Sequence, residues 1–285
     1  MMSLTFAAPF LAAAMTASPP PPADLEAQTN AWHEKRLKNL TSDDGWLTLV
    51  GLQWLEEGDQ PLQLPAPAPQ PSGTVTRHGD QVSFAPAPGV QATLGGQPFK
   101  GGPIPTDEGP KAVLQVGRLH FYAIKRGERL GIRMKDPEAE ARKKFHGIPR
   151  YPVSAAYRVE ARWEPLAAPK KIPVPTVLGT VDEMTAPGVA VFTLQGKELR
   201  LMPVIEEGED QLFFIFADET NKTDTYGAGR FLYARMPQDG KVVLDFNRAY
   251  NPPCAFSHFA TCPLPPRENR LPTRVEAGEK RAGDH

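Results

Sequence analysis

The chain has 285 residues and a mass of 31.2 kDa, which is enough for one large domain or two small ones. Its 32 basic and 33 acidic residues give a net charge of −1, which argues against a phosphate-tracking surface, so no nucleic-acid partner is predicted. The 32 prolines, more than twice the usual share of about 5%, favour short strands and constrained loops over long helices.

The first 23 residues differ in composition from the rest. The uncharged apolar run from Leu4 to Ala17 suits the core of a signal peptide and is shorter than the roughly 20 residues of a membrane span. No Lys or Arg precedes it, and Pro19 to Pro22 predict a stiff polyproline II spacer. We assign residues 1–23 to a signal peptide or a disordered Pro-rich leader. The first alternative predicts an extracytoplasmic protein, periplasmic or secreted, and the second a cytoplasmic one. No membrane span is predicted.

Residues 24–126 are predicted to form an N-terminal helix and a smaller β lobe. The helix runs from Asp24, its cap, to Leu40, with apolar residues on one side. An apolar run from Gly45 to Leu64 follows, broken at Gly51 and again by a turn at Gly58. Short alternating segments bounded by Gly or Pro then predict strands. These strands cover residues 74–77, 81–84, 90–94, 111–116 and 119–125.

Residues 127–277 are predicted to form the main β lobe, and residues 278–285 a polar tail. A short helix follows the cap and first-turn proline at Asp136 and Pro137. We expect a hairpin that turns at Gln195 and Gly196, and a strand buried on both faces at residues 211–216. The remaining predicted strands cover residues 130–135, 157–163, 172–177, 189–194, 198–204, 230–234 and 241–246.

The predicted fold class is therefore mostly β. It consists of two packed β lobes, built as sandwich or barrel-like antiparallel sheets, with an N-terminal helix and one short central helix.

Standard catalytic motifs are absent. The chain has no G-x-S-x-G, H-E-x-x-H, C-x-x-C or P-loop sequence, and the glycines at 227 and 229 do not make a dinucleotide fingerprint. No cofactor is predicted, no catalytic residue is assigned, and the sequence leaves open whether the protein is an enzyme.

Cys254, His258 and Cys262 are spaced as C-x3-H-x3-C. We favour a structural role for the two cysteines, as a disulfide or as buried thiols. A zinc site would need a fourth ligand, and a nucleophilic cysteine would need a stabilised thiolate, so no metal is predicted. Prolines at 252, 253 and 263 rule out a helix that would set His258 beside Cys254.

The polar run after the last apolar strand is the predicted ligand site. Asn251 precedes a proline, which holds it in extended geometry, and Asn, Arg and Tyr side chains at a strand end suit a carboxylate or carbonyl ligand. The alternative is that these groups satisfy loop carbonyls, and that Arg230 pairs with Asp245 or Glu268. The predicted ligand-binding residues are Arg230, Asn247, Arg248, Tyr250, Asn251 and Glu268.

A second basic group lies on adjacent predicted strands. Arg133 and Lys135 are two residues apart, so they share one face of a strand and could bind an anion together. We favour the alternative, a solvated strand face.

Several long motifs give the chain a family resemblance. Among them are KRGERLGIRMKDPEAEARKKF (Lys125 to Phe145), YPVSAAYRVEARW (Tyr151 to Trp163), TYGAGRFLYA (Thr225 to Ala234), and DFNRAYNPPCAF with ATCPLPPRENRL. Over about Gly45 to Lys280 the chain resembles the bacterial and archaeal family called domain of unknown function 1684. That family brings no established activity, so the resemblance implies none.

The predicted function is that of an exported β-rich protein that binds a small polar or anionic ligand in a pocket formed by the 226–270 loops. One alternative is a hydrolase-type enzyme that uses Cys254, Asp245 or Glu268 in the same pocket. Another is a structural envelope module with no active site. A small-molecule ligand is the only partner indicated, and protein partners cannot be inferred.

Overall fold

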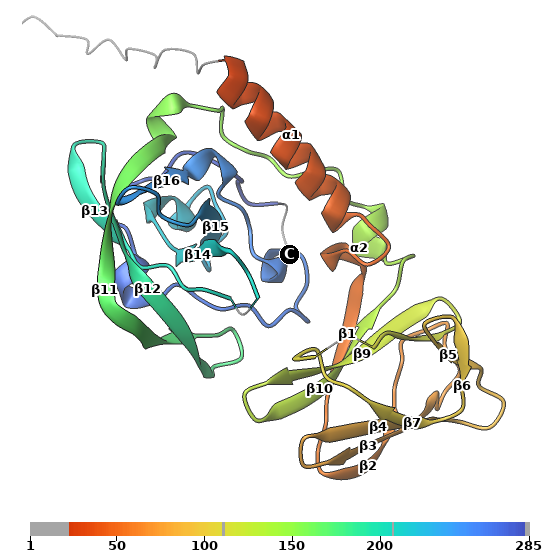
Figure 1. Ribbon diagram of the computed structural model, residues 1–285. Helices are drawn as coiled ribbons and strands as arrows, with labels where there is room; N and C mark the ends of the chain where they lie inside the picture. Colours follow the sequence, from red (N-terminus) through yellow and green to blue (C-terminus); the bar gives the residue numbers. More distant parts are fainter. Residues whose placement is uncertain (1–22, 110–111, 207, 283–285) are drawn as a thin grey trace, which may run out of the picture.

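The computed structural model describes residues 23–109, 112–206 and 208–282, and the predicted leader lies outside them except for Ala23. Two β lobes lie beside each other, and a long helix runs along the larger lobe and ends near the junction between the two (Figure 1). The described part contains two α-helices, α1 (Ala23–Leu40) and α2 (Glu140–Lys143). The predicted fold class, mostly β with antiparallel sheets and these two helices, is confirmed. Neither helix is long and apolar enough to span a bilayer.

The smaller lobe is a sandwich of two antiparallel sheets. Their inner faces share one apolar core, in which Phe84 packs edge-on against Phe121 at 5.2 Å between ring centroids. The larger sheet has the order β1-β10-β9-β8-β5-β6, and the smaller one β2-β3-β4-β7. The strands are β1 (Leu49–Trp54), β2 (Gly58–Leu62), β3 (Gly73–His78), β4 (Gln81–Pro86), β5 (Ala92–Leu94), β6 (Gln97–Phe99), β7 (Gly102–Ile104), β8 (Leu114–Val116), β9 (Leu119–Arg126) and β10 (Arg129–Lys135).

The boundary between the lobes lies one strand later than predicted. Strand β10 pairs with β9 and β1, so the smaller lobe extends to Lys135 and does not end at residue 126. Gly127, with φ of 59°, supplies only the tight turn that joins β9 to β10 as a hairpin. The glycine at 127 therefore indicates a turn within a hairpin and not a boundary between two lobes.

The larger lobe consists of a four-stranded sheet and a two-stranded hairpin around a second core. The order of the first sheet is β13-β12-β11-β16, and β14 pairs with β15. Buried aromatic residues join the two layers, because Phe246 packs against Phe192 and Phe216 at 5.6 Å. The strands are β11 (Arg158–Pro175), β12 (Val181–Leu194), β13 (Lys197–Leu201), β14 (Gln211–Phe216), β15 (Arg230–Arg235) and β16 (Lys241–Asp245).

Two local predictions in this lobe are confirmed. The β12–β13 hairpin turns at Gln195 and Gly196, which have φ of 51° and 74°, the left-handed values that a two-residue turn requires. Strand β14 is buried from its second residue to its end. One prediction differs, because residues 158–175 form a single long strand with an irregularity after Pro165, where two separate strands were expected.

Helix α1 precedes the smaller lobe in sequence, yet its side chains also bind the larger lobe. The Nε of Arg36 lies 2.8 Å from the Glu279 carboxylate, and its Nη2 donates to the Asn251 carbonyl at 2.7 Å. Glu279 is only 1% exposed. Glu279 belongs to the predicted polar tail, so the described residues of that tail, 278–282, are held against the larger lobe. The Arg36 guanidinium compensates the buried Glu279 carboxylate.

Candidate functional site

A cleft of about 470 Å³ lies between the two lobes, and both lobes and α1 line it. We call it the interlobe cleft. The smaller lobe supplies Arg126 and Arg133 from β9 and β10, and α1 supplies Arg36. The segment before β1 supplies Trp46. The larger lobe supplies the remaining lining residues, which are Asp182, Met184, Glu206, Phe213, Phe231, Tyr233, Tyr250, Pro253, Thr261, Cys262 and Pro263.

Two of the three arginines have carboxylate partners. Arg36 pairs with Glu279, as described above, and Arg126 makes a two-pronged pair with Asp107, at 2.8 and 3.1 Å. Arg126 also donates from Nε to the Thr261 hydroxyl at 3.1 Å. This last contact joins the smaller lobe to the loop that follows β16 in the larger lobe.

Arg133 is the exception. It is only 3% exposed, and within the described residues its one hydrogen bond runs from Nη2 to the same Thr261 hydroxyl, at 3.0 Å. Its Nε is buried without a hydrogen-bond partner. Among the residues that the structure describes, no carboxylate pairs with Arg133. A buried cation without a counter-charge is costly, so this guanidinium requires an explanation.

The position of Arg133 follows from the alternation of β10. Leu130, Ile132 and Met134 fill the core of the smaller lobe, which turns Arg133 and Lys135 to the opposite face. The expectation that this pair would form a solvated face is wrong, because both side chains are buried. Lys135 is neutralised by the Asp44 carboxylate, 2.6 Å from its Nζ. Arg133 instead lies over the Trp46 ring, 5.2 Å from the ring centroid, which offsets part of its desolvation.

Aromatic side chains form the wall of the cleft on the larger lobe. Tyr233 stacks on Phe213 at 4.8 Å and on Tyr250 at 6.2 Å, and the Arg36 guanidinium lies 4.4 Å from the centroid of Tyr250. Burial raises the pKa of both tyrosines, so both are neutral phenols near neutral pH. The Tyr233 hydroxyl donates to the Glu206 carboxylate.

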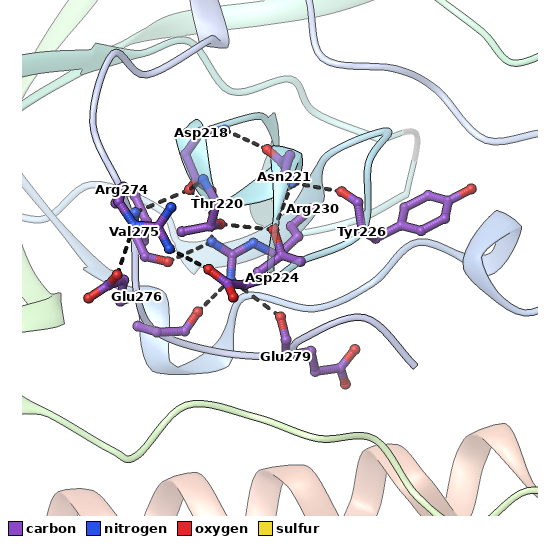
Figure 2. Close-up of polar contacts among 12 residues, drawn as sticks. Asp218, Thr220, Asn221, Asp224, Tyr226, Arg230, Arg274, Val275, Glu276 and Glu279 are labelled. Carbon is purple, nitrogen blue, oxygen red and sulfur yellow. Dashed lines mark hydrogen bonds and ion pairs between the residues drawn. The ribbon is translucent and has the colours of Figure 1, made fainter. Parts of the chain in front are cut away.

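The predicted ligand residue Arg230 lies away from this cleft, at the centre of an internal network (Figure 2). It is fully buried, and its Nη2 donates to the Asp218 carboxylate at 2.7 Å and to the Val275 carbonyl at 2.8 Å. Its Nη1 donates to the Ala277 carbonyl, and only its Nε lacks a partner. Its counter-charge is Asp218, and not Asp245 or Glu268 as considered from the sequence.

Three of the other predicted residues are also engaged within the protein. The Asn247 amide exchanges two hydrogen bonds of 2.9 Å with the Ser154 backbone. Arg248 lies 3.6 Å from the Asp245 carboxylate, and the Asn251 amide donates to the Lys280 carbonyl at 2.8 Å. Glu268 is exposed.

Of the six predicted residues, the structure therefore brings only Tyr250 into the interlobe cleft. The proline-flanked loop closes on its own backbone and on the C-terminal segment, so its polar groups do not converge on a cavity. The sequence analysis missed Arg36, Trp46 and Thr261. It identified Arg133 as an anion-binding alternative but did not favour it.

Cys254 and Cys262 are free thiols that lie against each other. The backbone N–H of Cys254 donates to the Cys262 sulfur at 3.1 Å. A hydrogen bond between the thiols lowers the pKa of Cys254, and the same hydrogen bond, together with burial, raises that of Cys262. His258 is exposed, and no group of three His, Cys, Asp or Glu within the described residues could hold a metal ion.

Fold and site together define a two-lobed β protein with a charged cleft between the lobes. Residues 143–280 match the family model described as a protein of unknown function (DUF1684), so this chain belongs to that family. The resemblance inferred from the sequence is thus confirmed over residues 143–280, which contain the strands of the larger lobe.

The solution NMR structure of an uncharacterized protein from Haloarcula marismortui is also similar to this chain. The two share 31% sequence identity, the match covers 50% of this chain and 81% of the other, and the TM-score is 0.43. The comparison with curated proteins found no match.

Replacing Arg230 with alanine is expected to destabilise the protein by about 3–5 kcal/mol, because the Asp218 carboxylate would be left buried without its counter-charge. Urea unfolding followed by tryptophan fluorescence measures the loss. The matched control is Arg162→Ala, which removes an arginine whose pair with Glu164 is exposed. Equal stability of the two variants would contradict a structural role for Arg230.

Replacing Cys262 with alanine is expected to raise the pKa of Cys254, because it removes the thiol that stabilises the Cys254 thiolate. The rate of Cys254 alkylation by iodoacetamide, followed by mass spectrometry across a pH series, should then rise at higher pH than in the wild type. His258→Ala is the control, since this side chain is exposed. An unchanged pH profile in Cys262→Ala would show that the two thiols do not interact.

Proposed function

We propose that this protein binds a small anionic ligand in the interlobe cleft and that Arg133 is the principal contact. The observation that carries the proposal is the burial of the Arg133 guanidinium without a carboxylate partner among the described residues. Perturbed or unpaired charged groups in a cleft are typical of functional sites. A carboxylate or phosphate group of a ligand supplies the missing counter-charge.

The neighbours of Arg133 support an anion site. Arg126 donates to the same Thr261 hydroxyl, which brings a second guanidinium to the same point. Asp107 neutralises Arg126 by a two-pronged pair, so the uncompensated charge at this point is that of Arg133. The cleft volume of about 470 Å³ lies within the range of sites for small molecules.

Binding is favoured over the hydrolase alternative by the position of its suggested catalytic groups. Asp245 accepts from the Asn247 backbone at 3.2 Å and lies near Arg248, and Glu268 is exposed. Neither these two carboxylates nor Cys254 lines the interlobe cleft. Export, which rests on the composition of residues 1–23, remains part of the proposal.

Benzoate, a small carboxylate with an apolar body, is a suitable probe. In isothermal titration calorimetry, Arg133→Gln is expected to weaken benzoate binding at least about tenfold, the effect of losing one charge-assisted hydrogen bond. The variant should remain folded and unfold at the same or a higher temperature, because it removes an uncompensated buried charge.

Arg129→Gln is the matched control for this experiment. It removes the same charge from the same strand, but Arg129 is exposed and lies over Trp54 at 3.9 Å, outside the cleft. Its benzoate affinity should equal that of the wild type at a fixed salt concentration. Equal benzoate affinity in wild type and Arg133→Gln, or no binding to either, would refute the proposed function.

A further inference from the structure

We propose that the ligand of the interlobe cleft is a zwitterion with an apolar body, of the class to which amino acids belong. This inference rests on the proposed function, because it takes Arg133 as the contact for the anionic group. It adds that Asp182 and Glu206 receive a cationic group of the same ligand.

The cleft holds charges of both signs that do not neutralise each other. Asp182 and Glu206 line the same cavity as the three arginines. In the described part of the chain, neither carboxylate forms an ion pair with any of these arginines. Arg36 pairs with Glu279, and Arg126 pairs with Asp107. A cleft whose charges were only structural would be expected to pair them internally.

The two carboxylates are brought together by the larger lobe. Asp182 and Met184 are two residues apart on β12 and both line the cleft, as the pleat of a strand requires. The backbone N–H of Ile205 donates to the Thr185 carbonyl at 2.9 Å, which fixes Glu206 beside that part of β12. Both carboxylates are half-buried, so water compensates their charges only in part.

A row of aromatic rings separates the acidic end from a basic one. Glu206 accepts from the Tyr233 hydroxyl, Tyr233 stacks on Tyr250, and the Arg36 guanidinium lies over the Tyr250 ring. The stacked rings present apolar surface between the two charged ends. A ligand that spans the cleft would place its apolar part along these rings and its charged groups at the two ends.

Arg133 provides an observation that is independent of the acidic pair. Arg133 lines the cleft and is only 3% exposed, and its Nε has no hydrogen-bond partner among the described residues. The anionic group of the ligand therefore meets Arg133, and the cationic group meets Asp182 and Glu206, which line the same cleft. The charge pattern selects against a ligand that carries only one of the two groups.

Three matched probes test the inference: L-phenylalanine, 3-phenylpropionate, which lacks the ammonium group, and 2-phenylethylamine, which lacks the carboxylate. Calorimetry with the wild-type protein should show phenylalanine binding about tenfold more tightly than either of the others, the gain of one charge-assisted contact. In the double variant Asp182→Asn with Glu206→Gln, the ratio of phenylalanine affinity to phenylpropionate affinity should fall to about one.

Glu183→Gln is the control, because Glu183 is exposed on β12 and points away from the lining residues on either side of it. It should preserve the wild-type ratio, and circular dichroism checks that every variant is folded. Phenylpropionate binding that depends on Arg133 and is as tight as phenylalanine binding would overturn the zwitterion inference and leave the proposed function intact. Absence of binding by all three probes would overturn both.

Discussion

Two arginines of the smaller lobe meet one hydroxyl group of the larger lobe, beside an apolar contact that Leu49 of β1 makes with the larger lobe. Arg126, at the end of β9, and Arg133, on β10, both donate to the side chain of Thr261 in the larger lobe. This contact brings two guanidinium groups to one point and buries one of them almost completely. Both arginines also line the interlobe cleft. Asp107 compensates the charge of Arg126, but no described carboxylate compensates that of Arg133.

Two buried arginines of this protein illustrate how the same side chain can have different roles. Arg230 is surrounded by the Asp218 carboxylate and by backbone carbonyls of the C-terminal segment, which it holds against β15 (Figure 2). Arg133 has a single hydroxyl as its hydrogen-bond partner and an aromatic ring beside it. A buried charge that is paired with a counter-charge stabilises the fold, whereas a charge without one at a cavity is available to a ligand. Burial alone does not separate the two roles, since both side chains are inaccessible to solvent.

Much of the fold could be predicted from the sequence, because local patterns determine it. The left-handed turn at Gln195 and Gly196 and the unbroken apolar run of β14 were both found from residue type and order. The assignment of β10 to the smaller lobe could not be found in this way, because strand pairing is a long-range property. The candidate site depends even more on contacts between residues that are distant in sequence. Arg133 and Lys135 were expected to share a face, but Trp46, which is distant in sequence, covers both side chains, and only Lys135 gains a carboxylate partner, Asp44.

A ligand in the interlobe cleft would contact both lobes at once. Arg126 and Arg133 belong to the smaller lobe, whereas Tyr250 and Glu206 belong to the larger one, and Arg36 on α1 is fixed to the larger lobe by Glu279. A ligand held at both ends of the cleft adds contacts between the lobes that do not exist without it. Since a ligand stabilises the state to which it binds, occupancy would favour the closed arrangement of the lobes over any more open one. The coupling would arise because a ligand that supplies the counter-charge of Arg133 also contacts the larger lobe, and a partner within the smaller lobe would not produce it.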